Sequence, residues 1–478
     1  MSTLIAALAA VAIVAQDQTV LRAAPRDSAQ QQAVLWQGDS LEIRGEKGDY
    51  LQVYDYRRER GGYIRTAQVR TQSLQPESAP ELLSIVRFLR DAPGAEALGI
   101  AYTAAYLKAA PAEAIDAEPF AALGAMADRL AHRASARQAK ASDTAIGAHL
   151  EVAAGYGVRM VGFERDGQMQ TCYDGDAFQR VLALPASDVQ RAQAALGLTA
   201  HECVPTDLTP LERGERDTWR GEVLDRVETA KLPDVLKNRV HMRKAGVWAG
   251  IAHRLARREN PGAAAVLAAG NRALEELAAV NPGELAEADA AAYSDAAVRV
   301  GASRWAAEPA VGAGALKLSV AVAPGQPGET CVQLVAGQPS EPAPLLTRCT
   351  YGVVWIASAT PNADGTALAL AVQPMDTWRE LWVFRKESEG WRVDVVPPAL
   401  GGPDTPSLGY VEFAGWTPDR TRMLAAREAK TGGRYRQSFE SIRLDTLETE
   451  KRADKPSSLS VFYRWQDPAW KRLTVSLR

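Results

Sequence analysis

The feature that most constrains the fold of this chain is that its sequence changes character twice. Residues 17–72 alternate apolar and polar positions between turn signals such as "QGD" and "EKGD", which is typical of short β-strands. Residues 73–310 are rich in Ala, Leu, Glu and Arg, and their Pro and Gly residues fall mostly at breaks, which is typical of helices. Residues 311–478 return to β-like runs bounded by Pro and Gly. Because 478 residues are too many for one core, we expect a multidomain α+β protein.

The first 16 residues form a separate apolar segment. The run from Leu4 to Ala15 has the length of a signal-peptide h-region and is too short to span a bilayer, which needs ~20 helical residues. Small residues precede the polar "QDQT", as at a cleavage site, although no Lys or Arg precedes the apolar run. We therefore expect residues 1–16 to be a signal peptide and the protein to be periplasmic or secreted, with no transmembrane segment after cleavage. The alternative is a buried N-terminal helix.

The four cysteines fall in two local pairs. Three connectivities are available, and only Cys172–Cys203 with Cys331–Cys349 keeps each bond within one region. Loops of this size would each stabilise the fold by roughly 3 kcal/mol in an oxidising compartment. The alternative is a metal site, but the sequence lacks C-x-x-C and H-x-x-x-H spacings. We expect two disulfides and no metal.

The first β-like region, residues 17–72, predicts a closed or nearly closed small barrel, because five short strands need partners for their edges. Its segments "TVLRAAP", "WQGDSLEIRGEKGDYLQVY" and "GGYIR" resemble the bacterial SH3-like (SH3b) domain. That family has an Arg-x-x-Pro start, a Gly-Asp turn into a central strand, an aromatic residue before x-x-Val and a Gly-aromatic-Ile/Val close. Two positions where Trp is commoner are Tyr here, which implies a shallower or more polar groove.

The resemblance implies that this domain binds cell-wall peptide or a proline-containing protein segment. Positive charge at Arg57 and Arg58 would suit a peptide that carries a carboxylate. The alternative role for the aromatic residues, Tyr50 and Tyr63 in particular, is core packing. The residues that we expect to contact a ligand are Trp36, Tyr50, Tyr54, Tyr56, Arg57 and Tyr63.

The middle region is expected to be mostly helical, with one β-hairpin in "GVRMVGFERDGQMQTCYDG". In the last region, "TPNADGTALALAV…RELWVFR" and "WTPDRTRMLAARE…FESIRLD" form a weak internal repeat that is similar to propeller blades of the TolB or WD type. Two blades are too few to close a propeller, because each blade leaves an edge that needs a neighbour. We therefore expect an all-β domain that is a sandwich or a partial propeller.

No catalytic motif stands out. Cys172 precedes a predicted helix, as does the nucleophile of NlpC-type peptidases, but that chemistry needs a histidine base and a disulfide is the favoured role. The sequence lacks G-x-S-x-G, S-x-x-K, H-E-x-x-H and Walker-type motifs, so we assign no catalytic residue and no cofactor. A net charge of −3 gives no global attraction to nucleic acid. Trp378 and Trp470, in polar contexts, are candidates for exposed contacts.

These observations predict an exported, non-enzymatic binding or scaffold protein of the bacterial cell envelope. Its expected partner is cell-wall peptide or an envelope protein. One alternative is a peptidoglycan hydrolase whose site is not recognisable in the sequence. A second alternative is a protein–protein interaction module that uses the helical region.

Overall fold

The computed structural model describes residues 10–136, 143–165, 167–258, 262–308, 317–337, 343–399 and 408–473. The chain is mixed α+β and forms two compact units. Unit 1 comprises residues 1–209 and 223–232, and unit 2 comprises residues 210–222 and 233–478. No helix of the described residues has an apolar stretch long enough to cross a bilayer.

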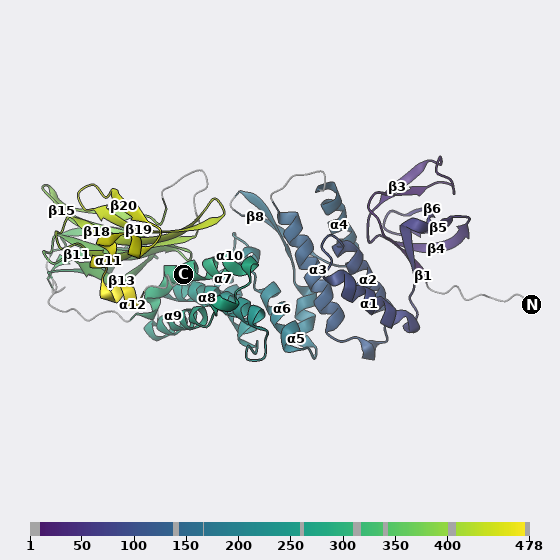
Figure 1. Cartoon of the computed structure of the whole chain (residues 1–478), viewed down its shortest axis with the longest axis horizontal. Helices are drawn as coiled ribbons and strands as arrows, with labels where there is room; N and C mark the ends of the chain where they lie inside the picture. Colours follow the sequence, from purple (N-terminus) through teal and green to yellow (C-terminus); the bar gives the residue numbers. More distant parts are fainter. Residues whose placement is uncertain are drawn as a thin grey trace, which may run out of the picture. The chain divides into compact units, whose positions relative to one another are not determined.

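Unit 1 contains a seven-stranded antiparallel sheet beside a group of helices (Figure 1). In spatial order the strands are β3 (Gln31–Leu35), β2 (Thr19–Arg22), β6 (Arg60–Arg65), β5 (Tyr50–Asp55), β4 (Ser40–Lys47), β1 (Ala10–Val14) and β7 (Val69–Ser73). The helices are α1 (Ala79–Arg90), α2 (Glu96–Ala109), α3 (Glu118–Ser135), α4 (Asp143–Gly155), α5 (Asp176–Ala183) and α6 (Asp188–Leu198). The expected hairpin is present as β8 (Met160–Arg165) and β9 (Gln168–Tyr173).

The first sheet differs from the expected barrel because its two ends do not pair with each other. Among the described strands, β3 pairs only with β2, and β7 pairs only with β1. No sheet in the described part of the chain closes into a barrel. The sheet is therefore open, with β3 and β7 at its edges.

Strand β1 lies inside the segment that we expected to be a signal peptide. It pairs with β4 on one side and with β7 on the other, and Ala12, Ile13 and Val14 are at most 1% exposed. The expected domain start at residue 17 is therefore wrong, because the sheet includes residues 10–14. A cleavage next to Ala15 would remove a strand, so any cleavage compatible with this sheet lies before Ala10. Residues 1–9 of the expected signal peptide lie outside the described residues.

Strand β1 also joins two cores of unit 1. Ala12 and Val14 pack with inward side chains of the sheet such as Leu41. Ile13 points the other way and packs with helical residues such as Leu82 and Ile100. This division follows from the alternation of side chains along a strand.

The two units do not follow the expected divisions at residues 73, 310 and 311, because unit 1 continues past residue 73 and unit 2 combines helices and strands. Val298 and Ala302 on α10 pack against Leu408 and Tyr410 at the start of β17, so the later helices share a core with the last sheet. The expected boundary at 310–311 itself lies outside the described residues. The helices of this unit are α7 (Pro210–Asp225, shared with unit 1), α8 (Asp234–Ala256), α9 (Ala263–Ala278), α10 (Ala290–Ser303), α11 (Ser460–Trp465) and α12 (Pro468–Leu473).

The strands of unit 2 form a three-stranded and an eight-stranded sheet. They are β10 (Leu318–Pro324), β11 (Thr330–Ala336), β12 (Leu346–Thr350), β13 (Val353–Pro361), β14 (Ala367–Met375), β15 (Trp378–Glu387), β16 (Gly390–Val396), β17 (Gly409–Trp416), β18 (Arg422–Thr431), β19 (Arg434–Arg443) and β20 (Thr449–Ala453). Strands β13–β16 and β17–β20 are two antiparallel meanders, joined by a short parallel pairing of β15 with β17. The two expected repeats occupy the same positions in the two meanders.

These sheets stack in layers. One face of the first meander packs on the sheet β10–β12, and its other face packs on the second meander. The far face of the second meander packs on α11 and α12. The expectation of an all-β domain is therefore wrong, because this region also contains helices α11 and α12.

Both expected disulfides are present. Cys172 is bonded to Cys203, and Cys331 is bonded to Cys349. The first joins β9 to the turn after α6, and the second joins directly opposite residues of β11 and β12. Two disulfides are compatible with an exported protein.

Candidate binding face

The outward side of the first sheet carries four of the six expected ligand contacts, three of them on its strands. Along β5, Leu51 and Val53 point into the core, so Tyr50 and Tyr54 lie on the opposite face. Tyr63 on β6 pairs with the residue between those two tyrosines and therefore shares their face. We call this side of strands β4, β5 and β6 the outer face.

Tyr54 and Tyr56 form a cluster with two charged residues at one end of the outer face. The two rings meet edge to face with their centroids 5.0 Å apart, and the Arg44 guanidinium lies 4.0 Å above the centre of the Tyr54 ring. The Tyr56 hydroxyl donates to Glu42 Oε2 at 2.8 Å, and Arg44 Nη2 lies 3.1 Å from the same oxygen. The Tyr56 hydrogen bond, helped by Arg44, lowers the pKa of Glu42, so this carboxylate stays ionised at neutral pH. Gly61 of β6 lies opposite Tyr54 and has no side chain, so it leaves one side of the Tyr54 ring uncovered.

Tyr50 is less available to a ligand than its neighbours. Its side chain is buried, and its hydroxyl donates to Asp27 Oδ1 at 2.6 Å. Arg65 Nε donates to the same oxygen at 3.0 Å, and its guanidinium lies 5.2 Å from the centre of the Tyr50 ring. Tyr63 is half-buried beside this group, opposite Arg22 on β2. Tyr50 therefore supports the outer face, and Tyr63 adds exposed surface to it.

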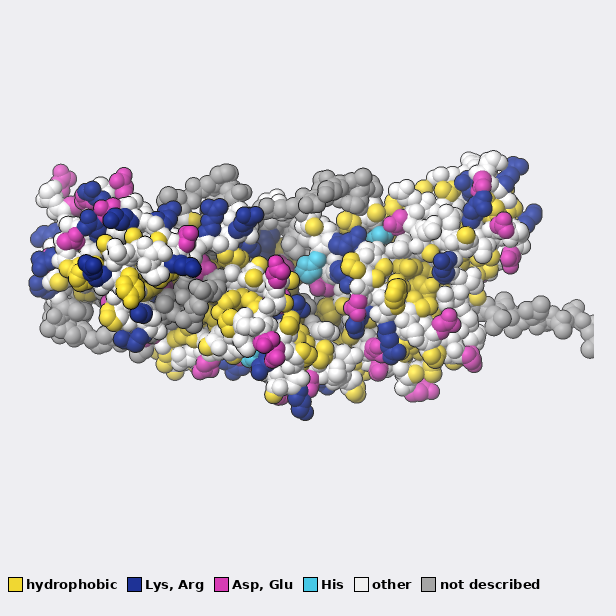
Figure 2. All heavy atoms as spheres, in the orientation of Figure 1, with side chains coloured by type: hydrophobic (Ala, Val, Ile, Leu, Met, Phe, Trp, Pro, Cys, Tyr) yellow, Lys and Arg dark blue, Asp and Glu magenta, His cyan; other side chains and the backbone are white. Residues whose placement is uncertain are grey.

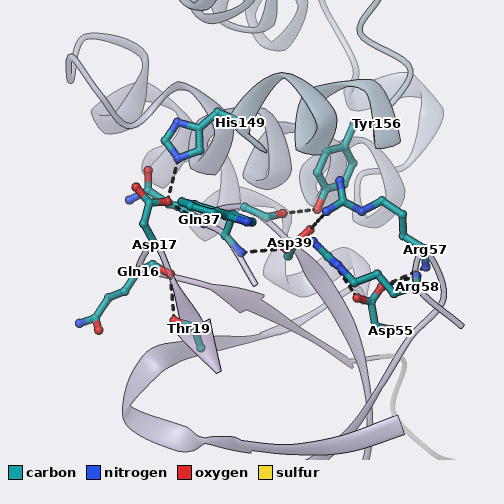
Figure 3. Close-up of polar contacts among 12 residues, drawn as sticks. Gln16, Asp17, Thr19, Gln37, Asp39, Asp55, Arg57, Arg58, His149 and Tyr156 are labelled. Atoms are coloured by element: carbon teal, nitrogen blue, oxygen red, sulfur yellow. Dashed lines mark hydrogen bonds and ion pairs between the residues drawn. The ribbon is translucent and has the colours of Figure 1, made fainter. Parts of the chain in front are cut away.

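Arg57 does not lie on the outer face. Its Nη2 atom is 2.8 Å from Asp39 Oδ1, and Arg58 contacts both Asp39, at 3.0 Å, and Asp55, at 2.7 Å (Figure 3). Asp39 and Asp55 are buried, so both arginines are held by carboxylates beneath them. The expected positive rim at Arg57 and Arg58 is therefore neutralised. Trp36 also lies next to Asp39 and its ion pairs, since its backbone N–H donates to Asp39 Oδ2 at 2.9 Å.

This group of ion pairs lies where the sheet meets α4. The Tyr156 hydroxyl donates to the carbonyl oxygen of Gly38 at 2.7 Å, and burial raises the pKa of Tyr156 (Figure 3). A Cβ atom at Gly38 would lie 2.5 Å from the carbonyl oxygen of Ala97, and its φ of +93° favours glycine. The turn after β3 is therefore fitted closely against the helices, and the first sheet is not a module on a free linker.

His149 on α4 makes a second polar contact with the sheet domain. Its Nε2 atom lies 2.7 Å from Asp17 Oδ1, which also accepts the backbone N–H of Gln37 at 3.1 Å. Its Nδ1 atom is buried and has no hydrogen-bond partner among the described residues. Sequence reasoning missed this junction, because no local pattern links Asp17 to His149.

The two tryptophans expected to be exposed are not. Trp378 is 7% exposed and Trp470 is 6% exposed. The Trp470 ring packs with Phe439 and Phe462 in the core of unit 2. The four cysteine sulfurs are all used in disulfides. Among the residues that sequence reasoning did not single out, Glu42 and Arg44 could have been found, since a hairpin register places β4 beside the tyrosines of β5.

Comparison with known proteins adds no identification. The chain matches no protein-family model, no curated protein and no solved structure.

Proposed function

We propose that the protein is an exported, non-enzymatic binding protein of the bacterial cell envelope, and that its outer face binds cell-wall peptide. The observation that carries this proposal is the cluster of Tyr54, Tyr56, Arg44 and Glu42. Tyr56 is 67% exposed, and Tyr54 is half-buried with one side uncovered. Aromatic rings with exposed polar tips are common at binding surfaces.

The charges of the cluster suit a peptide that carries both a carboxylate and an amine, as cell-wall peptides do. Arg44 and Glu42 pair with each other in solvent, with side chains 45% and 42% exposed. Exposed pairs of this kind contribute only ~0–1 kcal/mol, so a ligand can replace either partner at low cost. Arg44 would then bind a carboxylate of the ligand, and Glu42 would bind an amine.

The resemblance of residues 17–72 to SH3b domains supports the same ligand class. Corrected for the geometry, the proposed contacts are Tyr54, Tyr56 and Tyr63, with Arg44 and Glu42 in place of Arg57. The two disulfides are consistent with a location in the periplasm or outside the cell.

The test is sedimentation of the purified full chain with isolated cell-wall sacculi. The unaltered protein should pellet with sacculi without releasing soluble fragments. Because each truncated aromatic contact costs at least ~1 kcal/mol, Tyr54→Ala with Tyr56→Ala should weaken binding by about tenfold or more. The control is Tyr351→Ala, which removes a tyrosine that is 55% exposed in unit 2 and should leave binding unchanged.

The other outcomes separate the alternatives. Equal pelleting of the double variant and the unaltered protein would refute the outer face as the binding surface. Release of muropeptides would favour a hydrolase. Failure to pellet, together with capture of one specific envelope protein, would favour an interaction module.

A further inference from the structure

Helices α11 and α12 are held firmly on the last sheet of unit 2 by two buried aromatic side chains. The ring centroids of Phe462 and Trp470 are 5.3 Å apart, and both rings meet Phe439 of β19 edge to face. The Trp470 indole N–H also donates to Glu412 Oε2 at 2.8 Å. With these anchors inside, Tyr463, Arg464 and Trp465 of α11 and Lys471 and Arg472 of α12 are exposed.

The outward side chains are aromatic and basic. Tyr463 is 63% exposed and Trp465 is 43% exposed, and Arg464 lies between them in the sequence. Lys471 and Arg472 add two exposed cations on α12. We call these five residues the α11–α12 patch, and Figure 2 shows hydrophobic and basic side chains together over these helices.

The cations of the patch are available to a ligand. Across the described ranges of the chain, no carboxylate lies within 4.0 Å of the charged nitrogens of Arg464, Lys471 or Arg472. Lys and Arg outnumber Asp and Glu between Thr417 and Leu473, although the whole chain has a net charge of −3. The patch is therefore a local positive surface on a protein that is weakly negative overall, and it is complementary to an anionic partner.

The chemistry favours a lipid surface as that partner. Trp and Tyr side chains are enriched at the headgroup level of membranes, where the apolar ring and the polar tip are both accommodated. Lys and Arg beside them are attracted to anionic headgroups. A single-stranded nucleic acid needs a groove that follows its backbone, whereas this patch is the outward side of two short helices on a sheet.

We propose that the α11–α12 patch binds the surface of bilayers that contain anionic phospholipid. Tyr463 and Trp465 enter the headgroup layer, and Arg464, Lys471 and Arg472 contact phosphate groups. This site is distinct from the outer face of the first sheet, because it belongs to unit 2.

The test is sedimentation of the full chain with vesicles of phosphatidylglycerol and phosphatidylcholine, compared with vesicles of phosphatidylcholine alone. We expect binding only to the first kind, and weaker binding at high salt because ions screen the attraction. Each cation near such a surface contributes about fivefold in affinity, so Arg464→Gln, Lys471→Gln and Arg472→Gln together should weaken binding by about a hundredfold. Tyr463→Ser with Trp465→Ser should weaken binding at every salt concentration.

The matched control removes three exposed cations from unit 1, as Lys108→Gln, Arg226→Gln and Lys231→Gln. It changes the net charge equally and should retain vesicle binding, as should Tyr54→Ala with Tyr56→Ala. Circular dichroism confirms that each variant is folded. Absence of binding to phosphatidylglycerol vesicles at low salt, an equal loss in the control, or tighter binding to single-stranded RNA than to vesicles would each overturn the proposal.

Discussion

Ala12 on β1 lies directly opposite Leu41 on β4, and both side chains are almost completely buried. Their neighbour Ile13 points to the other side of the strand and packs in the helical core of unit 1. Ile13→Ala should lower the free energy of unfolding of unit 1 by about 2–4 kcal/mol, because the lost methyl groups leave a cavity. Urea unfolding followed by circular dichroism measures this loss. Val11→Ala, at a partly buried position of the same strand, should cost less than half as much, and an equal cost would contradict the packing of β1.

The disulfide between Cys172 and Cys203 should stabilise unit 1. It joins positions 31 residues apart, so a loop of that size predicts a loss of about 3–4 kcal/mol when both residues are replaced by Ser. The paired control, Cys331→Ser with Cys349→Ser, should lower the stability of unit 2 by about 3 kcal/mol. Limited proteolysis with mass spectrometry assigns each loss to a unit. Two titratable thiols in the unfolded, unreduced protein would contradict one of the bonds, and four would contradict both.

His132 should make the stability of unit 1 depend on pH. A hydrogen bond to Glu202, at 3.4 Å, and the charge of Asp128 raise the pKa of His132 to about 9. An unfolded histidine has a pKa near 6.5, so the stabilisation is fully present below pH ~6.5 and is lost as the pH rises through 9. Because the side chain is 51% exposed, the effect should be under ~1 kcal/mol.

The measurement is the free energy of unfolding of unaltered protein and of His132→Gln at pH 6 and at pH 10. The variant should be less stable at pH 6, and the two proteins should converge at pH 10. A difference that grows with pH would have the wrong sign for this ion pair.

Glu412 should be essential to the stability of unit 2. Its carboxylate accepts from Arg304 Nε at 2.9 Å and from Arg379 Nη2 at 3.2 Å, and all three side chains are at most 2% exposed. Glu412→Gln keeps the shape but removes the charge, and two buried guanidinium groups lose their counterion. The expected loss is about 3–5 kcal/mol in the unfolding free energy. Glu448→Gln, at an exposed position, should change it by less than ~0.5 kcal/mol.

Local patterns predicted the parts of the fold that local interactions decide. Turn signals and alternation located the strands near Tyr50 and Tyr63, and Pro and Gly breaks indicated that the middle region is mostly helical. The cysteine spacing predicted both disulfides. The hairpin β8–β9 was predicted from its turn and its two strand-like runs.

Features that depend on contacts between distant residues were not predictable in this way. The apolar run around Ile13 has the composition of a signal peptide, and only its pairing with β4 and β7 makes it a strand. In α11, aromatic and β-branched residues favour a strand locally, but the packing of Phe462 on Phe439 requires a helix. Arg57 was expected to contact a ligand because nothing nearby in the sequence reveals its contact with Asp39, 18 positions earlier.

The double role of β1 also limits how this gene can evolve. A recombination event that transferred the first sheet to another protein would leave Ile13 facing solvent and would open a gap among the helices that remained behind. Such exchanges would be selected against, so the sheet and the helices α1 and α2 should be inherited together as one unit of descent.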